Sequence, residues 1–272
     1  MKVDRGLLVE SLFPPLFFLL VVWPLVALVL DVRPSGIIKA IGDPYFWSAV
    51  VNSVLCAAAA ALMGVAMAIG FGYYHLFKRR SPLYRVADFL NDLPIALPHT
   101  VAGLALLLAF GRKYFWWLGE NGLAFTLVAV VLAMFFVSYP LAARTVQAAV
   151  EELGTDLVDV ARTLGDEPGE AYLRVVVPAI KEGLLGGALL SFSRSLSEFA
   201  AVIMFGGNVP GKTQVLASYV FARVEAGDFD VAVAASVFCM ILAVSVIALV
   251  RSLSGEFTRA AETGGDTVRV SG

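Results

Sequence analysis

The sequence predicts an all-α membrane protein that crosses the bilayer with six helices. Of its 272 residues, 59% are hydrophobic and only 15% are charged, and the mean hydropathy is +0.83. A soluble domain is typically about half apolar and about a quarter charged, because its surface faces water. The chain therefore has too few charges for a water-facing surface, and its length suits six spans of roughly 20 residues with connecting loops.

The six spans follow the apolar runs of the sequence. The first run, residues 12–30, is longer than the apolar part of a signal peptide, about 7–15 residues, and lacks a small-residue cleavage site, so we expect an uncleaved helix. The other five apolar runs are residues 48–74, 93–110, 123–141, 184–205 and 231–250. Residues 251–272 are expected to form a short solvated tail. We therefore expect residues 1–272 to form one transmembrane domain.

The distribution of positive charge predicts the orientation of the chain. Thirteen lysines and arginines lie outside the spans on the side that holds both termini, and six lie on the opposite side. Cytoplasmic loops collect positive charge. Both termini are therefore expected in the cytoplasm, together with the basic run Lys78-Arg79-Arg80.

Composition excludes several classes of function. A net charge of -2 provides no basic field for nucleic acid, and the sequence has no CxxC motif or Cys/His cluster that would predict a metal site. Cys56 and Cys239 lie inside apolar runs and are expected to be buried thiols rather than a disulfide.

The longest polar stretch, residues 142–183, lies between the fourth and fifth spans and has helical periodicity. Gly165 provides a stop, since glycine adopts the left-handed conformation that ends helices, and Pro168 can begin a second helix. An amphipathic helix at the membrane surface lies among headgroups or docks into a groove of another protein. Its mixed charge and narrow apolar stripe favour docking. The apolar face consists of Leu153, Leu157, Val160, Ala161 and Leu164.

Part of this stretch resembles the EAA loop of ABC importer permeases. Residues 159–165 (Asp-Val-Ala-Arg-Thr-Leu-Gly), nine further residues and then Val-Val-Val-Pro match the pattern Glu-Ala-Ala, three residues, Gly, nine residues, Ile-x-Leu-Pro, with aspartate in place of glutamate. In that family the loop forms the coupling helix that binds the ATP-hydrolysing subunit. The resemblance implies an ATPase-coupling segment that includes Asp159, Ala161, Arg162, Thr163, Leu164, Gly165 and Pro178.

Two further stretches narrow the resemblance. Residues 92–103 (Asp-Leu-Pro-Ile-Ala-Leu-Pro-His-Thr-Val-Ala-Gly) and 194–199 (Arg-Ser-Leu-Ser-Glu-Phe) resemble molybdate and tungstate permeases, with sulfate permeases next. The resemblance implies a type I ABC importer permease that is homodimeric in the plasma membrane of a prokaryote and forms the pathway for tungstate or molybdate. Sulfate or thiosulfate is the alternative substrate.

The resemblance also implies partners. Two copies of a separate ATPase subunit would bind ATP and Mg²⁺, and an extracytoplasmic binding protein would deliver the oxyanion. The chain itself is therefore expected to bind no cofactor and to catalyse no reaction.

A polar stripe marks the predicted fifth span. Ser191, Arg194, Ser195 and Glu198 are spaced by three, one and three residues, so they share one helical face. Ionisable groups inside a membrane normally face a bundle interior or a watery cavity and pair with each other, and Arg194 and Glu198 lie one turn apart. The stripe either lines the oxyanion pathway or gate, or is a structural lock against a neighbouring helix.

The start of the third span adds four pathway candidates. Pro94 and Pro98 lie one turn apart, free backbone carbonyls and permit a bend, which is either a fixed kink or a gating hinge. His99 either hydrogen-bonds a neighbour or contacts the substrate. The pair His99-Thr100 distinguishes tungstate-like from sulfate-like members of the family.

Residues 206–213 match G-x-x-x-x-G-K-[ST], the phosphate-binding loop of NTPases. That loop follows a strand in a cytoplasmic α/β domain, whereas here a membrane helix is expected before it and the charge count places it outside the cell. The sequence therefore predicts a turn between helices rather than an ATP site.

Two rival functions belong to other classes. An ion-coupled secondary transporter would use His99, Arg194 and Glu198 as a relay, but it leaves the coupling segment unexplained. An intramembrane enzyme would need a nucleophile–base set or a metal motif, which the sequence does not provide.

Overall fold

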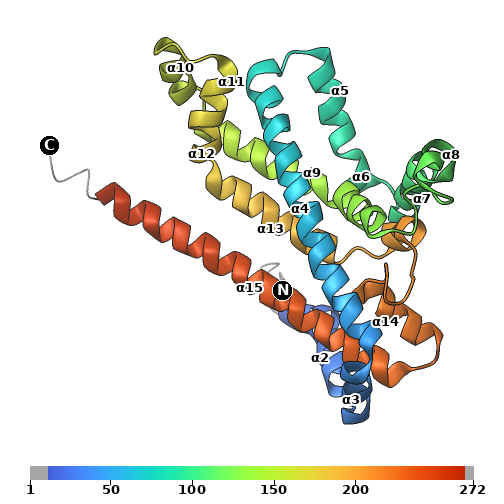
Figure 1. Ribbon diagram of the computed structural model, residues 1–272. Coiled ribbons are helices and arrows are strands. Elements are labelled where there is room, and N and C mark those ends of the chain that lie inside the picture. Colours follow the sequence, from blue (N-terminus) through green and yellow to red (C-terminus); the bar gives the residue numbers. More distant parts are fainter. Residues whose placement is uncertain (1–11, 267–272) are drawn as a thin grey trace, which may run out of the picture.

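The computed structural model describes residues 12–266, so the two ends, residues 1–11 and 267–272, lie outside the described range. Every regular element within it is helical, and its one extended pairing is an isolated bridge between Gly111 and Gly122. Figure 1 shows long helices packed at the centre, with α10 and α11 at one end of the molecule and α3 and α14 at the other.

Among the described residues, the helices long and apolar enough to cross a membrane match the predicted number of six spans when each bent pair counts as one. Two pairs are bent, by 118° between Pro82–Ala96 and His99–Phe110 and by 73° between Pro168–Ala179 and Lys181–Leu196. Counting each bent pair as one span gives six. The four continuous ones are Leu12–Leu30, Pro44–Lys78 (α4), Leu127–Leu153 (α9) and Phe229–Leu249, the first part of α15 (Phe229–Asp266).

The remaining elements are shorter and either complete or connect these spans. They are η1 (Phe18–Val22) and α2 (Trp23–Leu30) within the first span, α3 (Pro34–Gly42), α5 (Pro82–Asn91), α6 (Leu93–Ala96), α7 (His99–Phe110), α8 (Arg112–Phe115), η2 (Trp116–Leu118), α10 (Asp156–Thr163), α11 (Pro168–Ala171), η3 (Tyr172–Val176), α12 (Val177–Ala179), α13 (Lys181–Leu196), η4 (Val202–Gly206) and α14 (Leu216–Glu225).

Helices α4, α9 and α13 form the central bundle (Figure 1). Small residues line the contact faces, since Ala57, Ala60 and Gly64 of α4 and Ala142 of α9 are all buried. A methyl group at Gly64 would lie 3.2 Å from Ser191 Oγ of α13. Lipid gives packed helices no hydrophobic gain, so close backbone approach and interhelical hydrogen bonds hold such bundles together.

The third span is bent where its prolines predict, but it begins earlier than expected. The helix starts at Pro82 and breaks at Leu97, whose φ of -77° and ψ of 140° are extended. Pro98 causes the break, because a proline ring disfavours the helical conformation of the residue before it. Pro94 lies in the first turn of α6, where a missing N–H is harmless.

The polar stretch after the fourth span contains more helix than a loop would. Helix α9 continues from the span to Leu153, so residues 142–153 are a rigid extension of it. The single helix expected over residues 153–164 is wrong, because Gly154 adopts a φ of +70° and separates α9 from α10. Pro168 begins α11, as predicted.

The fifth span, expected to be continuous over residues 184–205, is interrupted. Helix α13 ends at Leu196, residues 197–199 are not helical, and the chain resumes with a short helix that includes η4. The predicted single face for Ser191, Arg194, Ser195 and Glu198 is therefore incorrect for Glu198, which lies in the interruption.

The last helix is longer than its apolar run. Helix α15 continues to Asp266, so the described part of the expected tail is helical. Cys56 and Cys239 are free thiols; Cys56 is buried, as predicted, whereas Cys239 is only half-buried.

Candidate functional site

Two helix breaks bring three ionisable side chains together between α7 and α13. Glu198 Oε2 lies 2.9 Å from Arg194 Nη2 and 3.1 Å from His99 Nδ1. Its other oxygen, Oε1, accepts the Ala201 N–H at 2.9 Å, which caps the next helical segment. The Glu198 side chain is only 1% exposed, whereas those of Arg194 and His99 are 26% and 34% exposed. The buried Glu198 carboxylate thus anchors the cluster, and the partly exposed Arg194 and His99 side chains form its accessible side.

A neutral imidazole that carries its proton on Nδ1 can bridge the two charged groups. His99 Nδ1–H then donates to Glu198, and His99 Nε2, 2.9 Å from Arg194 Nη2, accepts from the guanidinium, while the same Nη2 also lies 3.0 Å from Nδ1. Arg194 Nη1 also donates to Ser197 Oγ at 3.2 Å. The cluster then carries one positive and one negative charge, so it presents donors without a net positive charge.

The two serines of the predicted stripe face a different neighbour. Ser191 Oγ and Ser195 Oγ each lie 2.9 Å from Ser138 Oγ of α9, and all three side chains are fully buried. The hydroxyls therefore join α13 to α9 rather than facing open space. Ser138 was not singled out from the sequence, although a lone serine in an apolar run is a signal that could have identified it.

The remaining candidates of the third span lie around the bend. Thr100, next to His99 at the start of α7, is exposed, as is Pro98, whereas Pro94 is buried against the bundle. The bend thus places the His99-Thr100 pair at the first turn of a helix, beside the Arg194–Glu198 pair.

The segment predicted to couple to an ATPase has one buried face and one exposed face, but their residues differ from the predicted stripe. Val158 and Ala161 are buried against Tyr172 and Val176 in one apolar cluster. Leu157, Val160 and Leu164 point away and are 47%, 58% and 83% exposed. Also exposed are Asp159, Arg162, Thr163, Gly165 and Pro178.

Gly165 ends α10 in a Schellman motif. The Asp166 N–H donates to the Ala161 carbonyl at 3.2 Å and the Gly165 N–H to the Arg162 carbonyl at 3.1 Å. Gly165 has a φ of +105°, and a methyl group there would meet no atom within 4 Å. Backbone conformation, not space, therefore requires glycine at this position.

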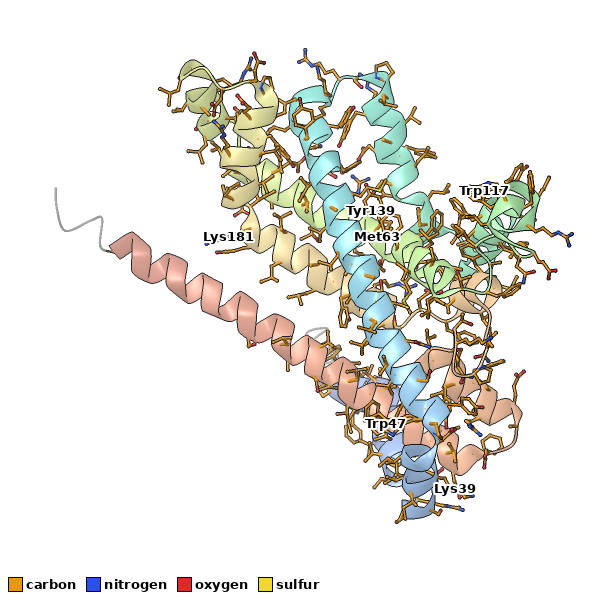
Figure 2. All side chains as sticks on the ribbon, in the orientation of Figure 1. Lys39, Trp47, Met63, Trp117, Tyr139 and Lys181 are labelled. Atoms are coloured by element: carbon orange, nitrogen blue, oxygen red, sulfur yellow. The ribbon has the colours of Figure 1, made fainter. Side chains whose placement is uncertain are left out.

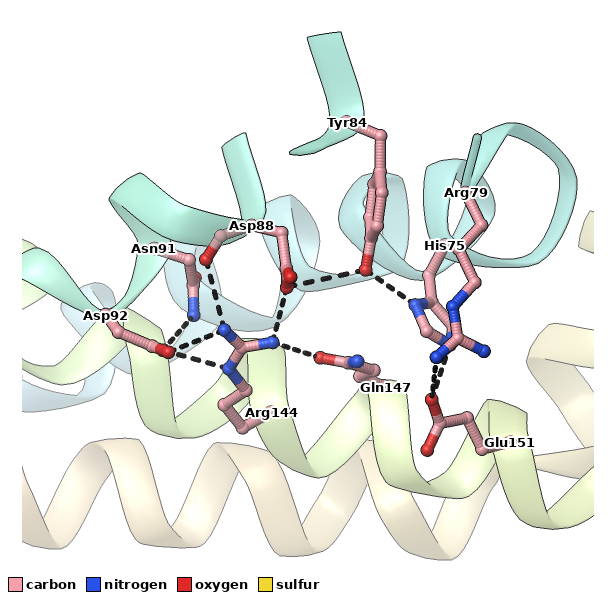
Figure 3. Close-up of polar contacts among 9 residues, drawn as sticks. All are labelled: His75, Arg79, Tyr84, Asp88, Asn91, Asp92, Arg144, Gln147 and Glu151. Atoms are coloured by element: carbon pink, nitrogen blue, oxygen red, sulfur yellow. Dashed lines mark hydrogen bonds and ion pairs between the residues drawn. The ribbon is translucent and has the colours of Figure 1, made fainter. Parts of the chain in front are cut away.

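A polar network at the junction of α4, α5 and α9 was not predicted (Figure 3). Arg144 of α9 contacts Asp88 at 2.5 Å and Asp92 at 2.6 Å, both on α5 or its C-terminal end. Tyr84 hydroxyl contacts His75 Nδ1 at 2.6 Å, and His75 Nε2 contacts Glu151 at 2.9 Å. This network ties the first limb of the bent third span to the rigid extension of α9.

The loop that matches the phosphate-binding pattern is built as a turn. The helical segment that includes η4 precedes it, and Thr213, whose hydroxyl would ligate magnesium in an NTPase, is 2% exposed and accepts the Val209 N–H. Asn52 of α4 donates to the carbonyls of Lys212 and Gln214, both at 3.0 Å. These bonds fix the loop against α4, and the predicted turn between helices is confirmed.

Comparison with known proteins identifies the family. Residues 60–258 match the family described as binding-protein-dependent transport system inner membrane component. The chain belongs to this family. It is 38% identical over 190 residues to the sulfate transport system permease protein CysT of Escherichia coli, covering 68% of each chain. It is 35% identical over 232 residues to the molybdenum transport system permease protein ModB of Mycobacterium tuberculosis, covering 84% of this chain and 87% of that one.

Solved structures of transporters share the fold. A bacterial alginate ABC transporter in complex with its pentasaccharide-bound periplasmic protein matches with a TM-score of 0.74 over 93% of this chain and 96% of that one, at 16% identity. The MetNI methionine ABC transporter matches with a TM-score of 0.60 over 80% and 98%, at 18% identity. The chain is a multi-pass membrane protein with the fold of type I ABC importer permeases.

Proposed function

We propose that the chain is the permease subunit of an ATP-binding cassette importer and forms the translocation pathway for tungstate or molybdate, with sulfate or thiosulfate as the alternative. The molybdenum and sulfate permeases among its relatives support a tetrahedral oxyanion. The molybdenum permease matches over the longer part of the chain, and the sulfate permease matches at higher identity.

The proposal that an ATPase subunit docks on this chain rests on the exposed face of α10. Leu157, Val160 and Leu164 form an apolar face on a short helix, while Val158 and Ala161 fix that helix to the rest of the chain. Apolar side chains that project from a firmly packed helix favour burial in a partner's groove. The partner would bind ATP and Mg²⁺ in two copies and move the permease through this contact.

The cluster of His99, Arg194 and Glu198 is the proposed contact point for the anion. An unpaired buried guanidinium would hold a dianion tightly and slow its release. Glu198 neutralises that charge, so Arg194 and the neighbouring Thr100 hydroxyl can offer donors without trapping the anion. A pathway between two copies of the chain would bring two such clusters together.

The orientation of the chain follows from its charge. The end of the molecule with α10 and α11 belongs to the side richer in lysine and arginine, and α3 and α14 lie at the other end (Figure 1). We therefore assign α10 and both termini to the cytoplasm of a prokaryotic cell and the opposite end to an extracytoplasmic binding protein.

Purification followed by reconstitution tests the proposal. The chain should copurify with an ATPase, and proteoliposomes that also contain the binding protein should take up radiolabelled molybdate only with ATP. Leu164→Asp should abolish copurification, whereas Val209→Asp, at the opposite end, should retain the ATPase. Uptake that is driven by an ion gradient without ATP would instead establish the secondary transporter with its His99 relay. Competition by unlabelled sulfate, molybdate and tungstate orders the substrates.

A further inference from the structure

An apolar groove runs between α4, α5 and α9. It has a volume of about 570 Å³, and of its thirteen lining residues only Asn91 carries an amide and none carries a charge. Phe71, Leu90 and Tyr139 represent the three walls, and Figure 2 labels Tyr139 on α9 beside α4. The groove is therefore shaped for a hydrocarbon rather than for an ion or a polar solute.

The groove is bordered by exposed apolar side chains of helices that can cross a membrane. Met67 and Leu83, which line it, are 54% and 66% exposed, and both belong to segments apolar enough to cross a membrane. Side chains of this kind contact acyl chains in a bilayer. An acyl chain gains no hydrophobic energy on moving from the bilayer into the groove, so any preference for one lipid must come from its headgroup.

The turn between α4 and α5, next to the groove residues Leu83 and Tyr84, is strongly basic. Where α4 ends and α5 begins, the chain exposes Lys78, Arg79, Arg80 and Arg85. Among the described residues, Lys78, Arg80 and Arg85 form no ion pair, and Arg79 lies 3.7 Å from Glu151. The nearby carboxylates Asp88 and Asp92 are engaged by Arg144.

We propose that this groove binds an anionic phospholipid, with one acyl chain between α4, α5 and α9 and the phosphate on Lys78, Arg80 and Arg85. Basic residues at the boundary of membrane helices attract anionic headgroups, and each cation adds about five-fold to the affinity. The lipid would fill the space beside α5. Together with α6, this helix forms the part of the third span that precedes the bend, so the lipid would hold that part of the span in place.

Native mass spectrometry of the purified full-length chain tests the proposal. The chain, titrated with phosphatidylglycerol or phosphatidylcholine of the same acyl composition, should bind the anionic lipid more tightly. The double variant Arg80→Gln, Arg85→Gln should weaken phosphatidylglycerol binding by about 25-fold. A matched double variant in the loop predicted on the opposite side of the membrane, Arg112→Gln, Lys113→Gln, should leave phosphatidylglycerol binding unchanged.

A second variant tests the groove itself. Gly70 lines the groove, and a Cβ added there would meet no atom within 4 Å, so Gly70→Leu can place its side chain in the groove. It should abolish tight phosphatidylglycerol binding, while Gly42→Leu on α3, which also has free space, should not.

Three results would overturn the proposal. These are equal affinity of the unmodified chain for the two lipids, unchanged binding in Gly70→Leu, and dissociation of a dimer in Gly70→Leu, which would identify a second copy of the chain as the occupant. The comparison of two lipids on the unmodified chain needs no variant and decides the question even if a variant fails to fold.

Discussion

Removal of the Glu198 carboxylate is the most informative change at the helix breaks. Glu198→Ala deletes the 2.9 Å ion pair with Arg194, the 3.1 Å contact with His99 and the cap on the Ala201 N–H. Deletion of one member of a buried ion pair costs about 3–5 kcal/mol, because the remaining charge stays uncompensated. Arg194 is 26% exposed and can turn partly toward polar surroundings, so we expect the lower half of that range, about 3–4 kcal/mol.

A cycle of variants separates the structural role from transport. Glu198→Gln keeps an acceptor for the Ala201 N–H and loses only the charge, so it should cost less than Glu198→Ala. The double variant Arg194→Gln, Glu198→Gln removes both charges and should recover at least about 2 kcal/mol of the loss in Glu198→Gln. Denaturant unfolding in mixed micelles measures these differences.

Uptake by the same variants decides the function of the pair. If the cluster contacts the anion, the double variant should fold well and still transport poorly. A cost below about 1 kcal/mol for Glu198→Ala, or no recovery in the double variant, would refute the assignment of Glu198 as the anchor of this site. Normal uptake in the well-folded double variant would show that the pair is structural only.

Three other predictions concern the described helices. Gly165→Ala should destabilise α10 by about 1–2 kcal/mol, because its φ of +105° disfavours a side chain, and uptake per ATP hydrolysed should fall in proteoliposomes. Ser138→Ala should cost about 1 kcal/mol in micelle unfolding, since two interhelical hydrogen bonds of about 0.6 kcal/mol each are lost; no change would mean that the serine contacts are incidental. Arg144→Ala should cost about 1 kcal/mol, because the Asp88 and Asp92 side chains are 37% and 54% exposed and gain water when the guanidinium is lost, and faster proteolysis within α5 would confirm that this limb has been released.

The positions of the helix breaks could be read from the sequence only where a proline or glycine dictates them. Pro98 breaks the third span and Gly165 ends α10, as predicted, since both act on their own backbone. Gly154 was missed because the apolar spacing continues across it, and a pattern of side chains does not report a left-handed residue. The interruption at residues 197–199 contains neither glycine nor proline, so no local signal announced it.

Burial on α10 shows a different limit of the sequence. The apolar positions predicted one continuous stripe, yet the structure buries Val158 and Ala161 and exposes Val160 and Leu164. A short helix can turn either face toward its support, and the choice depends on where Tyr172 and Val176 lie. The same exposed face is the one proposed to meet the ATPase.

The sequence by itself determined that this chain is a membrane protein with six apolar segments. The low fraction of charged residues and the long apolar runs can be read residue by residue, and neither depends on how the chain folds. The sequence also supplied the segments that resemble importer permeases. Only the tertiary structure decided which polar groups meet. His99 and Arg194 lie 95 positions apart, Ser138 and Ser195 57, and Asp92 and Arg144 52. Such contacts depend on how helices cross, because the partners of a polar group inside a bundle are set by distance in space and not by spacing along the chain.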